Sequence, residues 1–287
     1  MKRIEDLAVD DAPHAAATGA VSPPRWQLAM SLRVSAALHV GGALAVGLQP
    51  EVWPLVAGAL VANHCTLFGA SFLPKSRLLG PNIVRLPEAA IRRGEVALTF
   101  DDGPDPEVTP RVLDLLDAYG ARASFFCIGE RAAAFPDLVR DISRRGHSVE
   151  NHSHRHSTRF GWYGLGRLRR ELQAAQSTLG EISGRAPAFF RAPFGVRSPL
   201  LDPALAECGL RYVSWTRRGY DTVDGSAPSV LRRLTRNLAA GDVLLLHDGG
   251  PIGERRGAPS VLAVLPALLH RFGASGLKPV SLPAACA

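Results

Sequence analysis

The sequence has few cysteines, and they stand in none of the patterns that staple a fold or bind a metal. Its 287 residues contain four, without paired spacing: Cys65, Cys127, Cys208 and Cys286. This distribution argues against a disulfide framework and against a thiolate metal cluster. We expect four free thiols, as in chains that stay in a reducing compartment.

The sequence also lacks internal repeats, long low-complexity tracts and any RNA-binding or helix-turn-helix signature. Lys and Arg number 33 against 26 Asp and Glu, giving a net charge of +7, yet the arginines are dispersed. We therefore expect no nucleic-acid partner. We interpret the excess of basic residues as attraction to anionic phospholipid or to a phosphate-linked substrate. The alternative is that this charge only keeps the protein soluble.

An acidic pair is present where a predicted strand ends. The apolar run Glu95–Phe100 leads into Asp101 and Asp102, and Gly103–Pro104 then ends the strand at the carboxylates. Neighbouring side chains on a regular strand point to opposite faces, so only at a strand end can both carboxylates turn towards one site. An ordinary acidic turn is the alternative for this motif taken alone.

Two histidines follow about fifty residues later, at His152 and His156. Their spacing predicts both imidazoles on one side of a helical turn, with His154 pointing elsewhere. With one carboxylate they supply three ligands of a catalytic divalent-metal site and leave a fourth position open. The donor set favours Zn²⁺, with Co²⁺, Ni²⁺, Mn²⁺ or Fe²⁺ as alternatives. Water bound there would have its pKa lowered to about 7, which predicts hydrolytic chemistry.

These residues resemble the polysaccharide deacetylases of the NodB-homology type, carbohydrate esterase family 4. Thr99–Pro104 is similar to the first motif of that family, and His152–His156 is similar to the second. Arg191–Gly195 resembles the third motif, with Phe194 in place of the usual Tyr, and Leu245–His247 resembles the fifth. Four ordered motifs cover roughly 150 residues.

The resemblance implies a metal site with a base beside it. Asp102, His152 and His156 would hold the ion, and Asp101 would be the general base. Arg191 would pair with Asp101 and keep it ionised and aimed, because a neighbouring cation favours the carboxylate form.

The resemblance also implies an acid and a substrate slot. His247 would be the general acid that protonates the leaving amine, with Asp221 stabilising its imidazolium form. The backbone amide of Phe194 would donate to the oxyanion, a role that does not depend on the Tyr hydroxyl. Trp215 and Leu245 would line an apolar slot for the acyl methyl.

The fourth motif departs from the family, which often has Asp-x-x-Asp-Trp where this chain has Arg218–Thr222. Asp221 matches the second Asp, whereas Arg218 and Thr222 replace the first Asp and the Trp. The departure leaves the substrate contacts near Thr222 undefined.

From residue 95 onward, short apolar runs alternate with helical stretches, which predicts repeated β-α units. Thr109 is the expected N-cap of the first helix, with Pro110 at its first position. The expected strands are Val96–Phe100, Ala123–Ile128, His147–Asn151, Ala188–Arg191, Arg211–Trp215, Val243–His247 and Lys278–Ser281. The other expected helices are Gly164–Leu179, Pro228–Leu238 and Ser260–Phe272.

The motifs fall at or just past the C-terminal ends of predicted strands, where α/β barrels carry their active sites. Seven strands together with the family resemblance imply a distorted seven-stranded (β/α) barrel. An open doubly wound sheet is the alternative α/β topology.

The first third of the chain has a different character. Residues 1–25 are predicted to form a flexible tail, 26–74 a transmembrane or membrane-associated helical hairpin, 75–94 a linker and 95–287 the catalytic barrel. The prediction of a hairpin is based on two apolar stretches, Trp26–Leu48 and Val52–Leu73, each about long enough to cross a bilayer. Amphipathic helices packed on the barrel are one alternative, and a cleaved signal segment is another.

Basic residues flank the hairpin: Lys2, Arg3, Arg25 and Arg33 lie before it or near its start, and Lys75, Arg77 and Arg85 follow it. The only charged residue between the two stretches is the acidic Glu51. The positive-inside rule therefore places both ends in the cytoplasm, at a bacterial inner membrane. This orientation favours a lipid-linked sugar over finished wall polymer, and an extracytoplasmic catalytic domain is the alternative.

The expected function is metal-dependent removal of an N-acyl group, above all N-acetyl, from an amino sugar in a polysaccharide, oligosaccharide or lipid-linked glycan. Removal of formyl or another acyl group is one alternative. A barrel that binds glycan or glycolipid without turnover is another, although the ligands, base and acid implied by the resemblance are all present.

Overall fold

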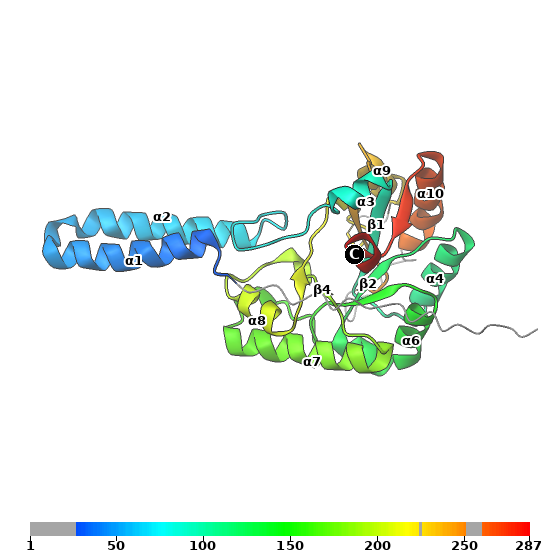
Figure 1. Cartoon of the computed structure of the whole chain (residues 1–287), viewed down its shortest axis with the longest axis horizontal. Coiled ribbons are helices and arrows are strands. Elements are labelled where there is room, and N and C mark those ends of the chain that lie inside the picture. The colour runs from blue at the N-terminus through cyan, green and yellow to red at the C-terminus, as the bar shows by residue number, and fades with distance from the viewer. Residues whose placement is uncertain (1–26, 224–225, 251–259) are drawn as a thin grey trace, which may run out of the picture.

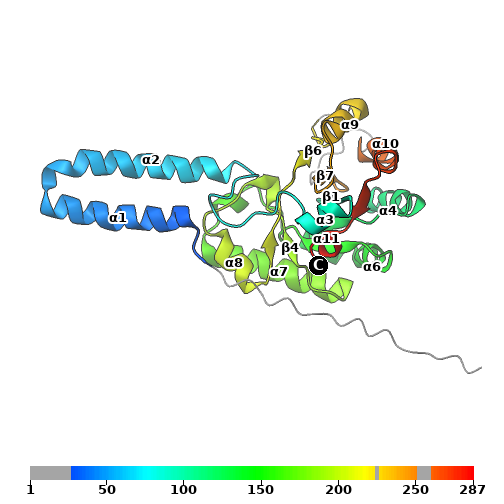
Figure 2. The ribbon, with the colours of Figure 1, turned by 45° about the horizontal axis from the view of Figure 1, so that its top comes forward.

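The chain from residue 95 onward forms a curled, all-parallel sheet covered by helices. The computed structural model describes residues 27–223, 226–250 and 260–287. Its strands follow the order β5-β4-β3-β2-β1-β7-β6, and β8 pairs beside β1. They are β1 (Glu95–Asp101), β2 (Ser124–Cys127), β3 (Ser148–Asn151), β4 (Phe189–Phe190), β5 (Arg211–Tyr212), β6 (Arg217–Arg218), β7 (Val243–His247) and β8 (Lys278–Val280). The predicted distorted (β/α) barrel is confirmed, and the sheet curls around its own axis (Figures 1 and 2).

Strand β1 is the centre of this sheet because it pairs with three others. Its first three residues pair with β8 and its last three with β2, while β7 runs along its other edge. Apart from Glu95, all of its residues are buried. The register sets Asp101 opposite His247, so two chemically active side chains end at the same level of the barrel.

All seven expected strands are present, and the structure adds an eighth. Strand β6 is only two residues long and consists of Arg217 and Arg218. It carries neither an apolar run nor an alternation, the features by which a sequence indicates a strand. Pairing of β6 with Leu244 and Leu245 of β7 defines it instead.

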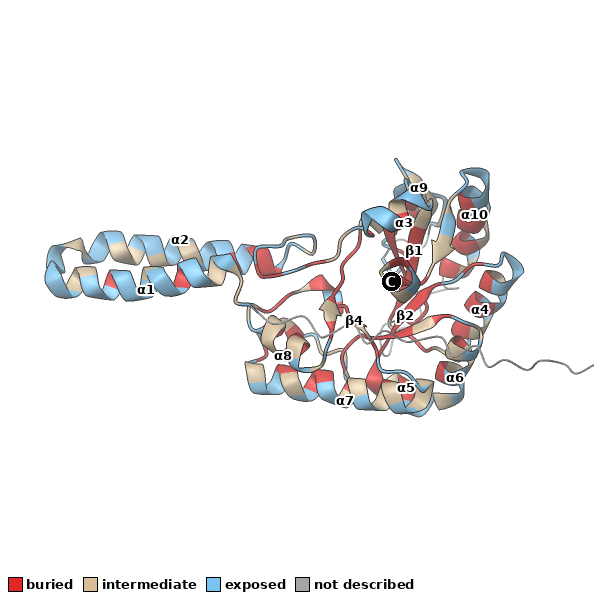
Figure 3. Ribbon diagram, viewed as in Figure 1, coloured by how far each residue is buried: buried red, intermediate tan, exposed pale blue. Residues whose placement is uncertain are grey.

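Helices cover the outside of the sheet. They are α4 (Thr109–Ala118), α5 (Gly129–Ala134), α6 (Pro136–Arg144), α7 (Leu165–Ser183), α8 (Leu201–Glu207), α9 (Ala227–Thr235) and α10 (Ser260–Ala274), with the short α11 (Leu282–Ala285) after β8. Their inward faces are buried while their outward faces are exposed (Figure 3). The largest apolar cluster joins β1, β2 and β7 to α4, α9 and α10.

One expected helix start is wrong in detail. Thr109 is the first residue of α4 and does not cap it. Its hydroxyl donates to Asp248 at 2.6 Å and accepts from the amide of Asp105. The Asp105 carboxylate instead accepts from the amides of Glu107 and Val108 in the turn before the helix. The Thr109 hydroxyl is thus used for a long-range contact.

Two apolar helices form a hairpin that projects away from the barrel (Figure 1). They are α1 (Met30–Leu48) and α2 (Trp53–Ser71), joined by a 3₁₀ turn (Pro50–Val52). Both are long and apolar enough to cross a membrane, and only 11% and 0% of their apolar windows are buried. Apart from the end of α2, the two helices are therefore not packed on the barrel, whereas the alternative of amphipathic helices required such packing. The predicted tail, residues 1–25, lies outside the described residues.

Polar residues within the hairpin face one another. Asn63 donates to the Ser35 hydroxyl at 2.8 Å, and the Nε2 atoms of His39 and His64 lie 3.2 Å apart. Cross-helix contacts of this kind give polar side chains in apolar helices a hydrogen-bonding partner. The residues that interrupt the apolar pattern thus become contacts between the two helices.

The segment after the hairpin bridges the open side of the barrel. Ile83 forms a parallel bridge with Val213 just beyond β5, and Arg85 forms an antiparallel bridge with Asp242 just before β7. The Arg85 guanidinium also binds the Asp242 carboxylate at 2.8 Å. The short helix α3 (Glu88–Arg92) then leads into β1. Backbone bonds from this segment thus reach both sides of the gap between β5 and β6.

Candidate metal centre

Three potential ligands converge at the C-terminal end of the sheet. Asp102 follows β1, while His152 and His156 follow β3, and one ligand atom from each lies within 4.8 Å of the others. The Nε2 atoms of His152 and His156 stand 3.3 and 3.1 Å from Oδ1 of Asp102. This oxygen is buried and accepts no hydrogen bond from the described residues. One carboxylate oxygen and two ring nitrogens fit a divalent cation.

The protonation of the two imidazoles suits this role. His152 donates from Nδ1 to the carbonyl of Arg191 at 2.8 Å, which leaves the Nε2 lone pair for a metal. Burial above all lowers the pKa of His156 to about 4, so this ring is neutral at pH 7. Burial also lowers the pKa of His152, but the attraction of Asp101 and Asp102 outweighs it and raises that pKa. The site thus has a negative potential that favours a cation.

The predicted helical turn between the two histidines is wrong. Residues 152–156 are irregular, with φ of 66° at Ser153 and 49° at His156. The Asn151 side chain accepts from the Ser153 amide, and the Ser153 hydroxyl accepts from the His156 amide. These side-chain turns place the two rings with their centroids 4.8 Å apart. Short polar side chains compete with the helix for backbone donors, and here they prevail.

A similar break of regular backbone turns both carboxylates inward. Asp101 is the last residue of β1, and Asp102 adopts a left-handed φ of 72°. Both side chains line one cavity, as the strand-end argument expected. A Cβ on the next residue, Gly103, would collide with the Asp248 carboxylate, so the turn requires glycine.

Asp101 is bound by a fully buried arginine. Arg191 donates to Oδ1 of Asp101 at 2.6 Å and to Thr99 and the Ser214 carbonyl at 2.9 Å. Its guanidinium also stands over the Phe126 ring at 4.2 Å. These contacts fix the direction of the carboxylate.

His247, on the neighbouring strand β7, lies beside its register partner Asp101. Its Nδ1 donates to Oδ1 of Asp221 at 2.9 Å, and its amide donates to Oδ2 at 2.8 Å. Burial lowers the pKa of the imidazole, but Asp221 outweighs burial and raises it to about 9. At neutral pH His247 is therefore an imidazolium with a proton available at Nε2.

The cavity between these groups has a volume of about 460 Å³. Phe194, Trp215, Leu245 and Thr222 line it together with the metal set. Trp215 and Leu245 are buried, whereas Phe194 is 53% exposed and has a φ of 58°. Each sequence-predicted site residue thus lies in this cavity or, for Arg191 and Asp221, directly behind a residue that does.

Sequence reasoning missed several residues of this site. Asp248 lies behind Gly103, and burial raises the pKa of its carboxyl to about 7. Arg131 donates to the carbonyls of Asp102 and Gly250 at 2.6 and 2.7 Å, which ties two active-site loops together. Arg218 lines the cavity from β6. Asp248 follows His247 directly, Arg218 stands out in the sequence only as a departure from the fourth motif, and no local pattern marks Arg131.

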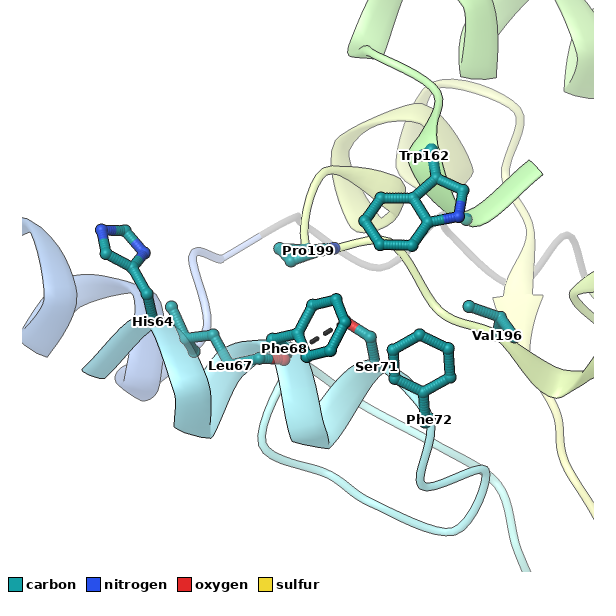
Figure 4. Close-up of a pocket in the computed structure, with 9 residues that line it drawn as sticks. His64, Leu67, Phe68, Ser71, Phe72, Trp162, Val196 and Pro199 are labelled. Atoms are coloured by element: carbon teal, nitrogen blue, oxygen red, sulfur yellow. Dashed lines mark hydrogen bonds between the residues drawn. The ribbon is translucent and has the colours of Figure 1, made fainter. Parts of the chain in front are cut away.

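A second cavity, the aromatic groove, lies between α2 and the barrel and has a volume of about 420 Å³. Figure 4 shows its walls, among them Phe68 of α2, Phe72 just after α2, Trp162, Val196 and Pro199. The centroid of the Trp162 ring lies 5.7 Å from that of Phe68 and 6.5 Å from that of Phe72.

The aromatic groove and the active-site cavity share their walls. Thr158 and Phe194 line the active site, whereas Gly161 and Val196, a few residues further along the same two segments, line the groove. The segments touch, because a Cβ on Gly161 would lie 2.5 Å from Val196. The two cavities are therefore neighbours separated by a thin partition.

A parallel (β/α) barrel that presents Asp, His and His beside a buried Asp–Arg pair and a His–Asp pair defines a hydrolase built for a divalent metal. The model of the polysaccharide deacetylase family matches residues 89–213. The chain is 33% identical over 197 residues to a peptidoglycan-N-acetylglucosamine deacetylase of Bacillus cereus, covering 67% of this chain and 68% of that one.

A chitooligosaccharide deacetylase of Azorhizobium caulinodans is also 33% identical, over 201 residues that cover 67% of this chain and 94% of that one. The solved structure of the Bc1960 peptidoglycan N-acetylglucosamine deacetylase superposes with a TM-score of 0.65 at 28% identity, over 71% of this chain and 92% of that one. The chain belongs to the polysaccharide deacetylase family, carbohydrate esterase family 4.

Proposed function

We propose that this polysaccharide deacetylase removes N-acetyl groups from amino sugars in glycans with the help of one divalent ion, Zn²⁺ above all. The convergence of Asp102, His152 and His156 on one point carries this proposal. Relatives named as peptidoglycan and chitooligosaccharide deacetylases support the substrate class. When bound, the ion supplies Lewis-acid activation of water and of the amide carbonyl.

The residues of the chain supply the base and the charge stabilisation. Asp101, oriented by its ion pair with Arg191, accepts a proton from the water that attacks the carbonyl carbon. The backbone N–H of Phe194 donates to the oxygen on which negative charge develops. Trp215 and Leu245 bound the space beside this carbon and accommodate the acyl methyl group.

His247 completes the reaction by donating its proton to the nitrogen as the C–N bond breaks. Water and amide thus give acetate and a free amine, without a covalent enzyme intermediate. Asp221 stabilises the imidazolium and orients the ring. A positioned acid and a positioned base each contribute about 10²- to 10⁴-fold to the rate.

The direct test is acetate release by detergent-purified protein from N-acetylated chitooligosaccharides, peptidoglycan fragments and polyprenyl-linked N-acetylglucosamine. Activity is expected to disappear with chelator and to return with added Zn²⁺. Activity that persists in chelator would contradict the metal mechanism, and binding without acetate release would favour a non-catalytic barrel.

The pH profile tests the acid directly. Because the reaction needs protonated His247, kcat/KM is expected to fall as pH rises through about 9. In Asp221→Asn the main cause that raises this pKa is removed, so the basic limb should move down towards the ordinary value of 6.5. The exposed Asp137→Asn, an identical chemical change, is the control and should keep the basic limb in place. If the basic limb of the kcat/KM profile does not move in Asp221→Asn, His247 is not the general acid.

We further propose that α1 and α2 form a membrane hairpin, residues 26–74, that precedes a linker and the catalytic barrel. A 19-residue helix rises about 28 Å, close to the thickness of about 30 Å of a hydrocarbon core. Basic residues on both flanks favour a cytoplasmic barrel at a bacterial inner membrane. A reporter fused after Ala287 that proved to be exported would reverse this orientation.

The aromatic groove supports a lipid-linked amino sugar as substrate. It opens beside the apolar surface of α2, and its partition from the active site is thin. A substrate whose sugar lies at the metal site can therefore place its hydrocarbon chain along α2. Trp162, 67% exposed and beside Phe68 and Phe72, fits the level of a membrane interface.

Trp162→Ser tests this placement. The wild-type protein is expected to prefer polyprenyl-linked N-acetylglucosamine over the same sugar without the chain. The variant should lower this preference roughly 10- to 150-fold, because a large aromatic contact is worth about 1.5–3 kcal/mol. Tyr119→Ser, an exposed aromatic at the end of α4, is the control. If Trp162→Ser lowered both activities equally, the groove would not bind the chain.

A further inference from the structure

Arg218 occupies an inward position at the mouth of the barrel. In the parallel pairing of β6 with β7 it stands opposite Leu245, and both side chains line the active-site cavity. Leu245 in turn stands opposite Thr99 in β1, two residues before Asp101. Side chains two apart on a strand share a face, so Arg218 belongs to the inward-facing row just below Asp101 and His247.

The other two arginines at the site are hydrogen-bonded to the protein. Arg191 is bound to Asp101, and Arg131 is bound to two backbone carbonyls. Arg218 differs, because none of its side-chain nitrogens donates a hydrogen bond within the described residues, and its Nε, like that of Arg191, is buried without a partner. Nor does any ion pair within 27–223, 226–250 and 260–287 involve its guanidinium. A buried donor without an acceptor is unfavourable, and a ligand that accepts from it removes this cost.

Aromatic rings hold the guanidinium of Arg218 in place. It stands over the Trp215 ring at 5.3 Å and over the Tyr220 ring at 4.8 Å. Stacking of this kind orients the planar group and leaves its N–H edge available for an acceptor. Because Trp215 also lines the acyl slot, the charge lies next to the position of the reacting sugar.

At position 218 the side chain has the opposite charge to the one that is usual in the resembling motif. Where the resembling motif often has an aspartate, this chain has Arg218, so the cavity gains a cation in place of an anion. Asp101 is balanced by Arg191 and Asp221 by His247. The Arg218 charge therefore has no counterpart in the described part of the site.

We infer that Arg218 binds an anionic group of the substrate, a phosphate or a carboxylate attached near the N-acetylated sugar. Guanidinium groups match both anions with two parallel N–H bonds. The inference rests on the proposed deacetylation and specifies its substrate class as a negatively charged amino-sugar compound. Neutral chitooligosaccharide is then the poorer substrate.

The test compares three substrates and two variants of Arg218. Chitotetraose is neutral, an N-acetylmuramic acid oligosaccharide carries carboxylates, and N-acetylglucosaminyl diphosphate polyprenol carries phosphates. The wild-type protein is expected to show a kcat/KM on at least one anionic substrate roughly 10- to 100-fold above that on chitotetraose, the factor that a charge-assisted bond gives. Arg218→Gln should bring this ratio close to one. Arg218→Lys should keep part of the preference, because the positive charge remains while the planar guanidinium is lost.

Arg140→Gln, which removes an exposed charge on α6, is the control and should keep the wild-type ratio. Preference for one anion identifies its source as phosphate or carboxylate. An unchanged ratio in Arg218→Gln, or a wild-type preference for chitotetraose, would overturn the inference. If no substrate released acetate, the proposed function would fail, and equilibrium binding of the same three compounds to zinc-loaded wild-type and Arg218→Gln protein would still decide the role of Arg218.

Discussion

Asp101→Asn is expected to reduce kcat about 10²- to 10⁴-fold while the protein keeps its metal, because the substitution removes the proposed general base and no proposed ligand. The amide has nearly the shape of the carboxylate, and its oxygen can still accept from Arg191. It cannot take a proton from water. Acetate release and metal content measured on the same preparation separate the two effects.

This substitution also leaves the buried Arg191 without its counter-charge. Loss of one partner of a buried ion pair typically costs about 3–5 kcal/mol, so a lower melting temperature is expected. Activity should therefore be measured well below the melting transition. Asp137→Asn, on the exposed surface of α6, is the matched control and should be stable and active. If Asp101→Asn retained wild-type kcat at full metal content, Asp101 would not be the base.

His156→Asn is expected to remove metal binding and with it activity, by roughly 10³-fold or more. An ion that activates both water and carbonyl contributes several kcal/mol to the barrier, and each 1.36 kcal/mol is a factor of ten. Asn tolerates the left-handed backbone at this position, where φ is 49°, so the loss reports on the ligand rather than on strain. Zn²⁺ binding by calorimetry and acetate release are the measurements.

His154→Asn provides the matched control two residues away. His154 lies outside the metal cluster, so this variant should bind Zn²⁺ as the wild-type protein does. Equal loss of Zn²⁺ in both variants would show that the loop, rather than His156 itself, maintains the site. Full activity of His156→Asn without bound metal would contradict the assigned chemistry.

The hairpin and the barrel meet beside the proposed active site. The segment after α2 bridges the gap between β5 and β6, and residues at the end of α2 form one wall of the aromatic groove. Arg218 lies in β6 at the same open side of the barrel. A lipid-linked, phosphate-bearing amino sugar would place its sugar in the proposed active site, its phosphate at Arg218 and its hydrocarbon chain in the aromatic groove. Binding of such a substrate therefore needs both the barrel and the hairpin.

The sequence by itself determined the barrel class, the apolar hairpin and the order of the motifs. Strand and helix periodicity is local, and Asp101, Asp102 and His247 follow apolar runs that end at recognisable breaks. It misjudged the backbone between His152 and His156, because residue spacing cannot show that the Asn151 and Ser153 side chains replace helical hydrogen bonds.

Only the tertiary structure decided which distant groups meet. Arg191 stands 90 positions from Asp101 in sequence and 2.6 Å from it in space. Contacts between remote segments also define strand β6 and the partition between the two cavities. The same packing buries the Nε of Arg218 without a hydrogen-bond partner among the described residues. Register and burial arise from the packing of the whole sheet, so no local pattern encodes them.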